Sequence, residues 1–165
     1  MGLAIALLTI SDTRTLAEDA SGDQLQRSIE QAGHRLRERS LCADDRYTIR
    51  AELSRWIADP GVDVVITSGG TGLTGRDGTP EAVEPLLDKT IDGFGELFRV
   101  LSFESIGTST LQSRCLAGVA NGTFVFVLPG SLDAVTTAWK RLIHAQLDAE
   151  TRPCNLAQLR QRLKE

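Results

Sequence analysis

The stretch VDVVITSGGTGLTGRDGTPEA, residues 62–82, joins a short apolar run to a long loop of glycines, threonines and charged residues. The run from Val62 to Thr67 predicts a strand covered on both faces, because strands of parallel sheets are apolar along their whole length. Pro80 predicts the start of a helix over residues 80–88, since proline suits the first helical turn. A strand, a loop and a helix in this order indicate one unit of an α/β fold.

Apolar runs of the same kind lie on both sides of this unit. LAIALLTIS (residues 3–11) and TFVFVLPGS (residues 123–131) predict two more buried strands, and RLRERSL (residues 35–41) predicts a weaker strand at an edge. Apolar residues at helical spacing predict helices over residues 21–34, 44–59, 132–148 and most of 94–119, with an interruption at Gly107. We therefore expect a three-layer α/β/α sandwich with a mainly parallel sheet. Residues 1–150 form the expected domain, and residues 151–165 are its C-terminal tail.

Composition argues against several classes of protein. A net charge of -4 over 165 residues does not suit a nucleic-acid-binding or membrane-surface protein. We see no signal peptide and no apolar run of membrane-spanning length, so we expect a cytoplasmic protein. The three cysteines lie far apart without a CxxC pair, which argues against a zinc site or a disulfide framework.

The glycine-rich loop does not match the two common nucleotide-binding motifs. Residues 70–75, GTGLTG, fit G-x-G-x-x-G, but no helix opens within these glycines and no acidic residue ends a strand about 20 residues later. No Gly-Lys-Ser/Thr sequence follows, as a Walker A loop requires. The glycine N–H groups, the hydroxyls of Thr71, Thr74 and Thr79, and the cation of Arg76 nevertheless suit an anion such as phosphate.

Asp77 is unusual beside a phosphate, because two negative charges repel each other unless a cation lies between them. Mg²⁺ binds in this way, through one or two carboxylates together with substrate phosphates. Asp44 is a second candidate carboxylate, and Asp12 follows the first expected strand. Alternatives stay open at this point: Asp77 as a residue of a solvated turn, and Asp44 as part of an ordinary helix N-terminus.

Five segments together resemble the MoaB/MogA family of molybdenum cofactor biosynthesis proteins, and the likeness covers nearly the whole chain. They are TSGGTGLTGRDGTPEA (67–82), FGELFR (94–99), SFESIGTSTLQSR (102–114), AGVAN (117–121) and TRPCN (151–155). The last segment points to the MoaB branch. The resemblance implies a MogA-like α/β fold and assembly into trimers or hexamers. It also implies adenylylation of molybdopterin: the terminal phosphate of the pterin attacks the α-phosphate of MgATP, and pyrophosphate leaves.

The resemblance also carries the family's functional residues over to this sequence. Asp44 and Asp77 are implied to be catalytic and to bind Mg²⁺. The segment from Gly69 to Gly72 matches the nucleotide-phosphate loop, and Ser113 with Arg114 matches the pterin side of the site. The implied substrate contacts are Ser11, Asp12, Ser68, Gly69, Gly70, Thr71, Gly72, Arg76, Thr79, Glu81, Ser113, Arg114, Pro129, Gly130 and Ser131.

Departures from the family pattern leave other functions open. Gly75 stands where many members have Pro, and Gly78 stands where many have Val, so this loop is looser. Some members have lost an acidic residue here and are inactive, whereas this chain keeps both. The alternatives are a molybdopterin-binding protein without catalysis and a hydrolase of nucleotide-like pyrophosphates or amides. Expected partners are molybdopterin, ATP, further copies of the chain and other proteins of molybdenum cofactor biosynthesis, with no nucleic acid and no membrane.

Apolar residues between positions 94 and 119 exceed the single stripe that a helix on a sheet needs. The set consists of Phe94, Leu97, Phe98, Val100, Leu101, Phe103 and Ile106. Because this set wraps further round the helix than one stripe, we expect part of it to form a subunit interface.

Overall fold

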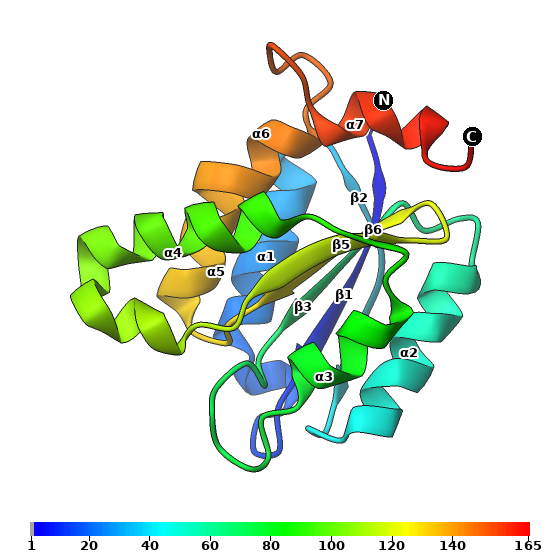
Figure 1. The fold of residues 1–165 in the computed structure, drawn as a ribbon. Coiled ribbons are helices and arrows are strands. Elements are labelled where there is room, and N and C mark those ends of the chain that lie inside the picture. Colours follow the sequence, from blue (N-terminus) through cyan, green and yellow to red (C-terminus); the bar gives the residue numbers. More distant parts are fainter. Residues whose placement is uncertain (1) are drawn as a thin grey trace.

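The computed structural model describes residues 2–165, so Met1, the first residue of the expected domain, lies outside the described part of the chain. A six-stranded sheet with the order β2-β1-β3-β6-β5-β4 runs through this part (Figure 1). Its strands are β1 (Ala4–Ile10), β2 (Arg35–Cys42), β3 (Val64–Ser68), β4 (Lys89–Thr90), β5 (Leu116–Ala120) and β6 (Thr123–Leu128). The neighbours β2, β1, β3 and β6 are parallel, whereas β5 is antiparallel to β6 and to β4. The expected mainly parallel sheet is confirmed.

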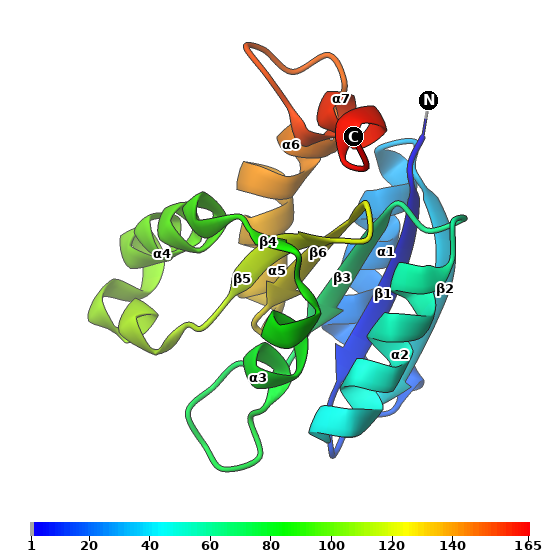
Figure 2. The ribbon, with the colours of Figure 1, turned by 45° about the vertical axis from the view of Figure 1, so that its right-hand side comes forward.

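Helices cover both faces of this sheet. They are α1 (Ala20–Gln31), α2 (Arg46–Ala58), α3 (Thr79–Val83), α4 (Asp92–Ile106), α5 (Leu132–Ala138), α6 (His144–Leu147) and α7 (Leu156–Leu159). One hydrophobic core joins the sheet to α1, α4 and α5, and a second core joins its other face to α2 and α3 (Figures 1 and 2). The α/β/α sandwich follows directly from these two cores.

Burial explains why the three apolar runs become the central strands. Every residue of β1, β3 and β6 is buried, because helices cover both sides of each strand. The strand β2, predicted from residues 35–41, lies at an edge as expected, and none of its residues is fully buried. In α2, the side chains of Ile49, Leu53 and Trp56 are fully buried on one face.

The prediction of helix over most of residues 94–119 was wrong for its second half. Helix α4 ends at Ile106, a 3-10 segment follows at Gly107–Gln112, and β5 then pairs antiparallel with β6. The turn between these two strands is Asn121-Gly122, where both residues have positive φ (48° and 79°). Asn-Gly is the preferred sequence of such two-residue hairpin turns, so this dipeptide was the available signal for β5.

Two predicted helices also differ in detail. The helix expected over residues 80–88 ends at Val83 and passes into a short 3-10 segment, Glu84–Leu86, because Pro85 cannot donate a helical hydrogen bond. The helix expected over residues 132–148 is continuous but contains a π segment at Trp139–Ile143. In the tail, Leu156 and Leu163 pack against the core that contains α1, α4 and α5. Within the described residues, no helix is both long enough and apolar enough to cross a membrane.

Candidate functional site

The loops with unusual chemistry meet at one edge of the sheet, where β1, β3 and β6 end (Figure 1). The ends are level, because Thr9 lies opposite Ser68 and Ser68 lies opposite Leu128. A cavity of about 570 Å³ opens among the three loops and is closed on one side by α4. This is the place where parallel α/β sheets bind ligands, and the volume suits a ligand of ordinary size.

The glycine loop needs its glycines at the two positions that follow β3. Gly69 and Gly70 have φ of +104° and +66°, a region that side chains disfavour. A side chain at Gly69 would collide with the carbonyl of Ile10, and one at Gly70 would come within 2.6 Å of the Asp44 carboxylate. The loop backbone therefore lies against both the end of β1 and Asp44.

Hydrogen bonds anchor this loop at both of its ends. Gly69 N donates to the carbonyl of Leu128 at 3.0 Å, which ties the loop to the end of β6. Thr79 N donates to the Gly70 carbonyl at 3.0 Å, and the Thr79 hydroxyl donates to the Gly69 carbonyl at 2.9 Å. Thr79 is buried, so its side chain holds the loop from behind rather than facing the cavity.

Arg114 holds the middle of the same loop. Its Nε donates to the carbonyl of Gly72 at 2.9 Å, and its Nη2 donates to the carbonyls of Gly72 at 2.6 Å and Asp77 at 3.1 Å. Its Nη1 forms an ion pair with the carboxylate of Glu81 at the start of α3. Burial is the largest single influence on the pKa of Glu81 and raises it, but the hydrogen bond from Arg114, a backbone hydrogen bond and the charges of Arg114 and Arg46 together lower that pKa below its usual value.

Asp77 lies across the loop from Gly72 and lines the cavity. Its carboxylate accepts hydrogen bonds from the backbone N–H and the hydroxyl of Thr74. The hydroxyl contact in particular lowers the pKa of Asp77, so its carboxylate is ionised at neutral pH. A side chain at Gly72 would come within 2.6 Å of this carboxylate, so Asp77 also rests directly against the loop backbone.

Asp44 is a nearly buried carboxylate, 9% exposed, on the other side of the loop. It accepts a hydrogen bond from Gly78 N at 3.2 Å. Burial raises the pKa of Asp44, and the negative charges of Asp77 and Asp12 add to this effect. Asp45, not Asp44, caps helix α2 by accepting from Thr48 N at 2.8 Å. The alternative that Asp44 is the capping residue is therefore excluded.

Asp12 and Arg76 connect the loop after β1 to the glycine loop. The guanidinium of Arg76 donates from Nε and Nη2 to the two carboxylate oxygens of Asp12, at 2.9 and 2.8 Å. The hydrogen bond from Arg76 lowers the pKa of Asp12. Asp12 also accepts from Asp44 N at 3.0 Å, so it positions the backbone of Asp44 as well.

Comparison with known proteins agrees with this geometry. A family model described as a probable molybdopterin binding domain matches residues 6–149. Molybdenum cofactor biosynthesis protein B of Escherichia coli (strain K12) is 54% identical over 151 residues, which cover 92% of this chain and 89% of that protein. This chain belongs to the MoaB family of molybdenum cofactor biosynthesis proteins.

Solved structures of MoaB proteins share the whole fold. A crystal structure of a molybdenum cofactor biosynthesis protein B superposes with a TM-score of 0.89 at 39% identity, covering 99% of this chain and 97% of that one. The tungsten cofactor synthesizing protein MoaB from Pyrococcus furiosus superposes with a TM-score of 0.77 at 35% identity, covering 86% of this chain and 90% of that one. The MogA-like fold implied by the sequence is thus confirmed.

In this MoaB-family chain, the residues implied to be catalytic, to bind Mg²⁺ or to contact substrate divide into two groups. Those that line the cavity are Ser11, Gly69, Gly70, Thr71, Gly72, Asp77, Ser113, Pro129, Gly130 and Ser131. Those placed behind or beside the loop are Asp12, Asp44, Ser68, Arg76, Thr79, Glu81 and Arg114. Thr79 and Arg114 position the first group directly through hydrogen bonds, and Glu81 pairs with Arg114. Asp12, Asp44 and Arg76 instead bond to one another or to Gly78, and the buried hydroxyl of Ser68 has no hydrogen-bond partner among the described residues.

The sequence interpretation missed several residues of the cavity wall. Arg14 and Asp133 bring charges to it, and Phe98, Ser102 and Ile106 of α4 form much of its remaining surface. Phe98 and Ile106 belong to the apolar set that predicts a subunit interface, because the helical pattern alone does not say which members of that set face a cavity. For Arg14 a signal existed, since it follows the first strand in the same loop as Asp12.

The site offers two carboxylates as metal ligands, which is the number that suits Mg²⁺ bound together with a nucleotide. Within residues 2–165, no group of three or more His, Cys, Asp or Glu side chains is placed to hold a metal ion. Mg²⁺ in phosphate sites keeps several waters and needs only one or two protein carboxylates, with substrate phosphates as further ligands. Asp44 and Asp77, which rest against the loop at Gly70 and Gly72, offer that ligand set.

Proposed function

We propose that this chain acts in molybdenum cofactor biosynthesis by adenylylating molybdopterin with MgATP. The terminal phosphate of molybdopterin attacks the α-phosphate of ATP, the bond to the β-phosphate breaks, and pyrophosphate leaves. The observation that carries the proposal is the glycine loop with one carboxylate on each side, Asp44 and Asp77, at the edge of a cavity. A protein that only stores a pterin has no need for two acids beside a phosphate loop.

The chain's own residues would act mainly by holding two polyanions in line. Gly70, Thr71 and Gly72 line the cavity together with Ser11 and Ser131, and the backbone N–H groups of the first three and the hydroxyls of the two serines suit phosphate oxygens. Such positioning supplies much of the rate acceleration in phosphoryl and nucleotidyl transfer. Asp44 and Asp77 would hold Mg²⁺, which when bound neutralises charge that develops on the phosphates. No general base is needed, because a phosphate nucleophile is already ionised at neutral pH.

The rest of the cavity suits the flat ring of a pterin or an adenine. Ile10, Phe98 and Ile106 contribute apolar surface to the cavity wall. Apolar walls with a few polar groups at fixed positions are typical of small-molecule sites. The cavity thus offers surfaces for both the charged and the uncharged part of each substrate.

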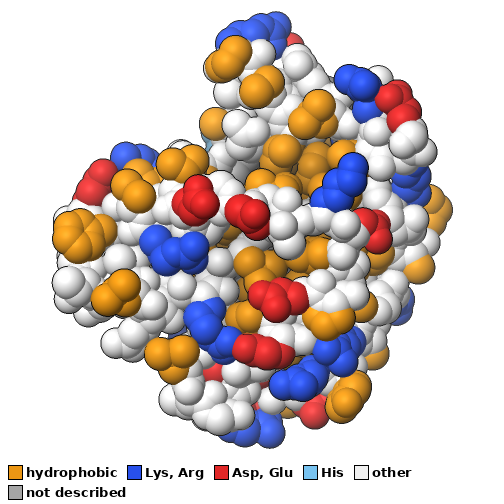
Figure 3. Space-filling view, viewed as in Figure 1, with side chains coloured by type: hydrophobic (Ala, Val, Ile, Leu, Met, Phe, Trp, Pro, Cys, Tyr) orange, Lys and Arg blue, Asp and Glu red, His pale blue; other side chains and the backbone are white. Residues whose placement is uncertain are grey.

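We also propose that the chain forms a homo-oligomer through α4. Leu97, Val100, Phe103 and Ile106 are 55%, 62%, 58% and 50% exposed. Figure 3 shows hydrophobic side chains on the side of the molecule where α4 lies. A row of exposed apolar side chains on one helix is typical of a subunit interface. Assembly into trimers or hexamers remains a prediction, and so does location in the cytoplasm.

Single-turnover formation of adenylylated molybdopterin tests the proposed function. Purified protein in excess over molybdopterin is mixed with MgATP, and both the adenylylated product and pyrophosphate are measured. We expect the two to appear together in equal amounts. Binding of molybdopterin without either product would instead support the catalytically silent alternative.

A further inference from the structure

Three arginines lie at the candidate site, and two of them are paired with carboxylates. Arg76 donates from two nitrogens to the carboxylate of Asp12. Arg114 donates to carbonyls of the glycine loop and pairs with Glu81. Recruiting either one to a ligand would leave a carboxylate or several carbonyl groups without their partner, which carries a free-energy cost.

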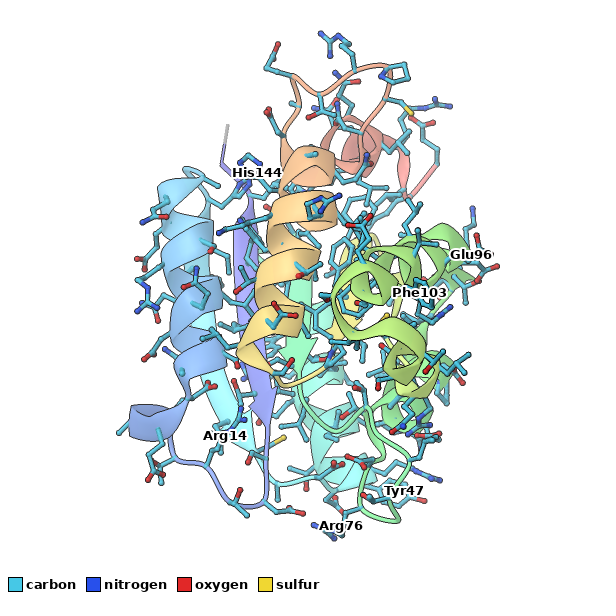
Figure 4. All side chains as sticks on the ribbon, turned by 90° about the vertical axis from the view of Figure 1, so that its left-hand side faces the viewer. Arg14, Tyr47, Arg76, Glu96, Phe103 and His144 are labelled. Carbon is cyan, nitrogen blue, oxygen red and sulfur yellow. The ribbon has the colours of Figure 1, made fainter. Side chains whose placement is uncertain are left out.

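Arg14 is bonded differently. Its Nη1 donates to the carbonyl of Gly130 at 3.2 Å, and no carboxylate lies within 4.0 Å of its guanidinium among residues 2–165. The side chain is exposed and lines the cavity. Figure 4 places Arg14 and Arg76 at the same end of the sheet, on the loops that follow β1 and β3. Arg14 therefore brings to the cavity a positive charge that no carboxylate neutralises.

The structure lets the Arg14 side chain move while its backbone stays in place. The hydroxyl of Ser11 accepts hydrogen bonds from the N–H groups of Thr13 and Arg14, at 3.2 and 3.0 Å, which fixes the turn. The carbonyl of Gly130 also accepts from the hydroxyl of Ser21 at 2.8 Å. If the guanidinium leaves Gly130 for a ligand, this carbonyl keeps a hydrogen bond, so the rearrangement costs little.

The cavity wall carries more acidic than basic side chains, so Arg14 is its main attraction for an anion. Among the described residues that line it, Asp77 and Asp133 are acidic and Arg14 is the one lysine or arginine. Arginine matches the oxygens of a phosphate with parallel N–H donors. We infer that Arg14 is a ligand-binding residue that contacts a phosphate group in this cavity, from ATP or from molybdopterin. This inference rests on the proposed function.

Calorimetry on four proteins tests the inference. The wild type, Arg14→Ala, Arg14→Lys and the control Arg27→Ala are each titrated with MgATP, inorganic pyrophosphate and molybdopterin. Arg27 is an exposed arginine of α1 that bonds only to Gln24 and does not line the cavity, so its loss changes the net charge equally. The melting temperatures of all four proteins should agree, because Arg14 supports no buried contact.

Loss of a charged hydrogen bond predicts that Arg14→Ala binds about 10- to 150-fold more weakly than Arg27→Ala. Arg14→Lys should fall between, since lysine keeps the charge but not the parallel donors. Weaker binding of MgATP and pyrophosphate alone assigns Arg14 to the nucleotide, and weaker binding of molybdopterin alone assigns it to the pterin. Equal affinities of Arg14→Ala and Arg27→Ala for all three ligands, or no binding of any by the wild type, overturn the inference.

The product assay separates this result from the proposed function. If Arg14→Ala loses affinity while the wild type forms no adenylylated molybdopterin, Arg14 is a phosphate contact in a protein that does not catalyse the transfer. If the wild type forms the product and Arg14→Ala binds normally, the function stands and the role of Arg14 is wrong.

Discussion

The guanidinium of Arg114 holds the carbonyl of Gly72 with two hydrogen bonds, 2.9 Å from Nε and 2.6 Å from Nη2. These hydrogen bonds connect the segment before β5 with the middle of the glycine loop, so they join parts of the chain that are 42 residues apart. The same guanidinium reaches the Asp77 carbonyl and the Glu81 carboxylate. Arg114 thus positions the loop on which Asp77 lies.

This contact changes what we expect of Arg114→Ala. From the sequence, Arg114 would hold the phosphate of the pterin, and its loss would weaken molybdopterin binding while sparing ATP. Because its donors are engaged with the loop, we now expect both affinities to fall about tenfold or more. Hydrogen exchange at residues 70–78 should become faster in the same variant.

Arg114→Lys is the matched control for this prediction. Lysine keeps the charge near Glu81 but cannot bridge the carbonyls of Gly72 and Asp77 with a planar set of donors. Hydrogen exchange at residues 70–78 should therefore be faster in Arg114→Lys than in the wild type, as in Arg114→Ala. If only molybdopterin affinity falls and loop exchange is unchanged, Arg114 contacts the pterin directly, as the sequence resemblance implied.

Glu38 gives the fold a pH-dependent contribution far from the site. Its carboxylate accepts from Arg55 Nη1 and Nη2 at 2.9 and 2.6 Å and from Trp56 Nε1 at 2.9 Å. The hydrogen bonds from Arg55 and then Trp56 lower the pKa of Glu38 from 4.5 to about 2. A lowered acid pKa stabilises the folded chain above the unfolded value, and this contribution is lost as the pH falls from about 4.5 to about 2.

Urea unfolding of the wild type and Glu38→Gln across this pH range measures the effect. The side chains of Glu38 and Arg55 are 40% and 50% exposed, so solvent screening limits the difference to about 1 kcal/mol or less at pH 7. The wild type should be the more stable at pH 7, and the gap should close towards pH 2. A gap that is constant with pH would show that the ion pair does not matter and that Gln is simply a poorer fit.

The exposed face of α4 predicts that assembly depends on Phe103. This side chain is 58% exposed, and Figure 4 labels it on α4. In an interface, a charge at this position would be buried without a partner and would cost several kcal/mol. Light scattering should show at least a trimer for the wild type and smaller species for Phe103→Glu at micromolar concentration.

Arg27→Ala is a suitable control for this assembly test, because Arg27 is an exposed residue of α1 and does not belong to the apolar row of α4. It should assemble as the wild type does. A wild type that is monomeric at micromolar concentration would show that the apolar face serves another purpose.

The sequence predicted the strands with continuous apolar runs and the edge strand β2, and it missed β4 and β5. β1, β3 and β6 have no polar face, so their pattern was plain. β4 has two residues, and β5 is LAGVA, where Gly118 lies so close to Lys89 that a side chain would come within 2.6 Å of its carbonyl. Such a strand is specified by its neighbours in the sheet, which a local pattern does not contain.

The same limit applies to the site. Loop residues that follow the apolar strands, such as Thr71 and Gly130, were predicted to bind ligand and do line the cavity. The bonds of Arg114 were not predictable, because backbone carbonyls have no signature in a sequence. Asp133 and Phe98 were missed because they lie on helices, and only the packing of these helices brings them to the cavity.

Asp77→Asn is the most direct test of the catalytic role. The change keeps the shape of the side chain but removes the charge expected to bind Mg²⁺. Nucleotide binding should survive, because the N–H groups of the glycine loop remain. Turnover should fall at least about 100-fold, or about 2.7 kcal/mol of barrier, since the metal stabilises charge that develops in the transition state.

Thr74→Val separates the charge of Asp77 from its place in the loop. The Asp77 carboxylate accepts from both the N–H and the hydroxyl of Thr74, so Asn at position 77 also disturbs the turn. Thr74→Val removes the hydroxyl contact and leaves the carboxylate charged. We expect less than tenfold loss of single-turnover rate in Thr74→Val, and melting temperatures within a few degrees of wild type for both variants, because the loop is largely exposed. Equal losses in the two variants would show that Asp77 acts as a turn residue, and a wild-type rate in Asp77→Asn would remove the main reason for regarding this chain as an enzyme.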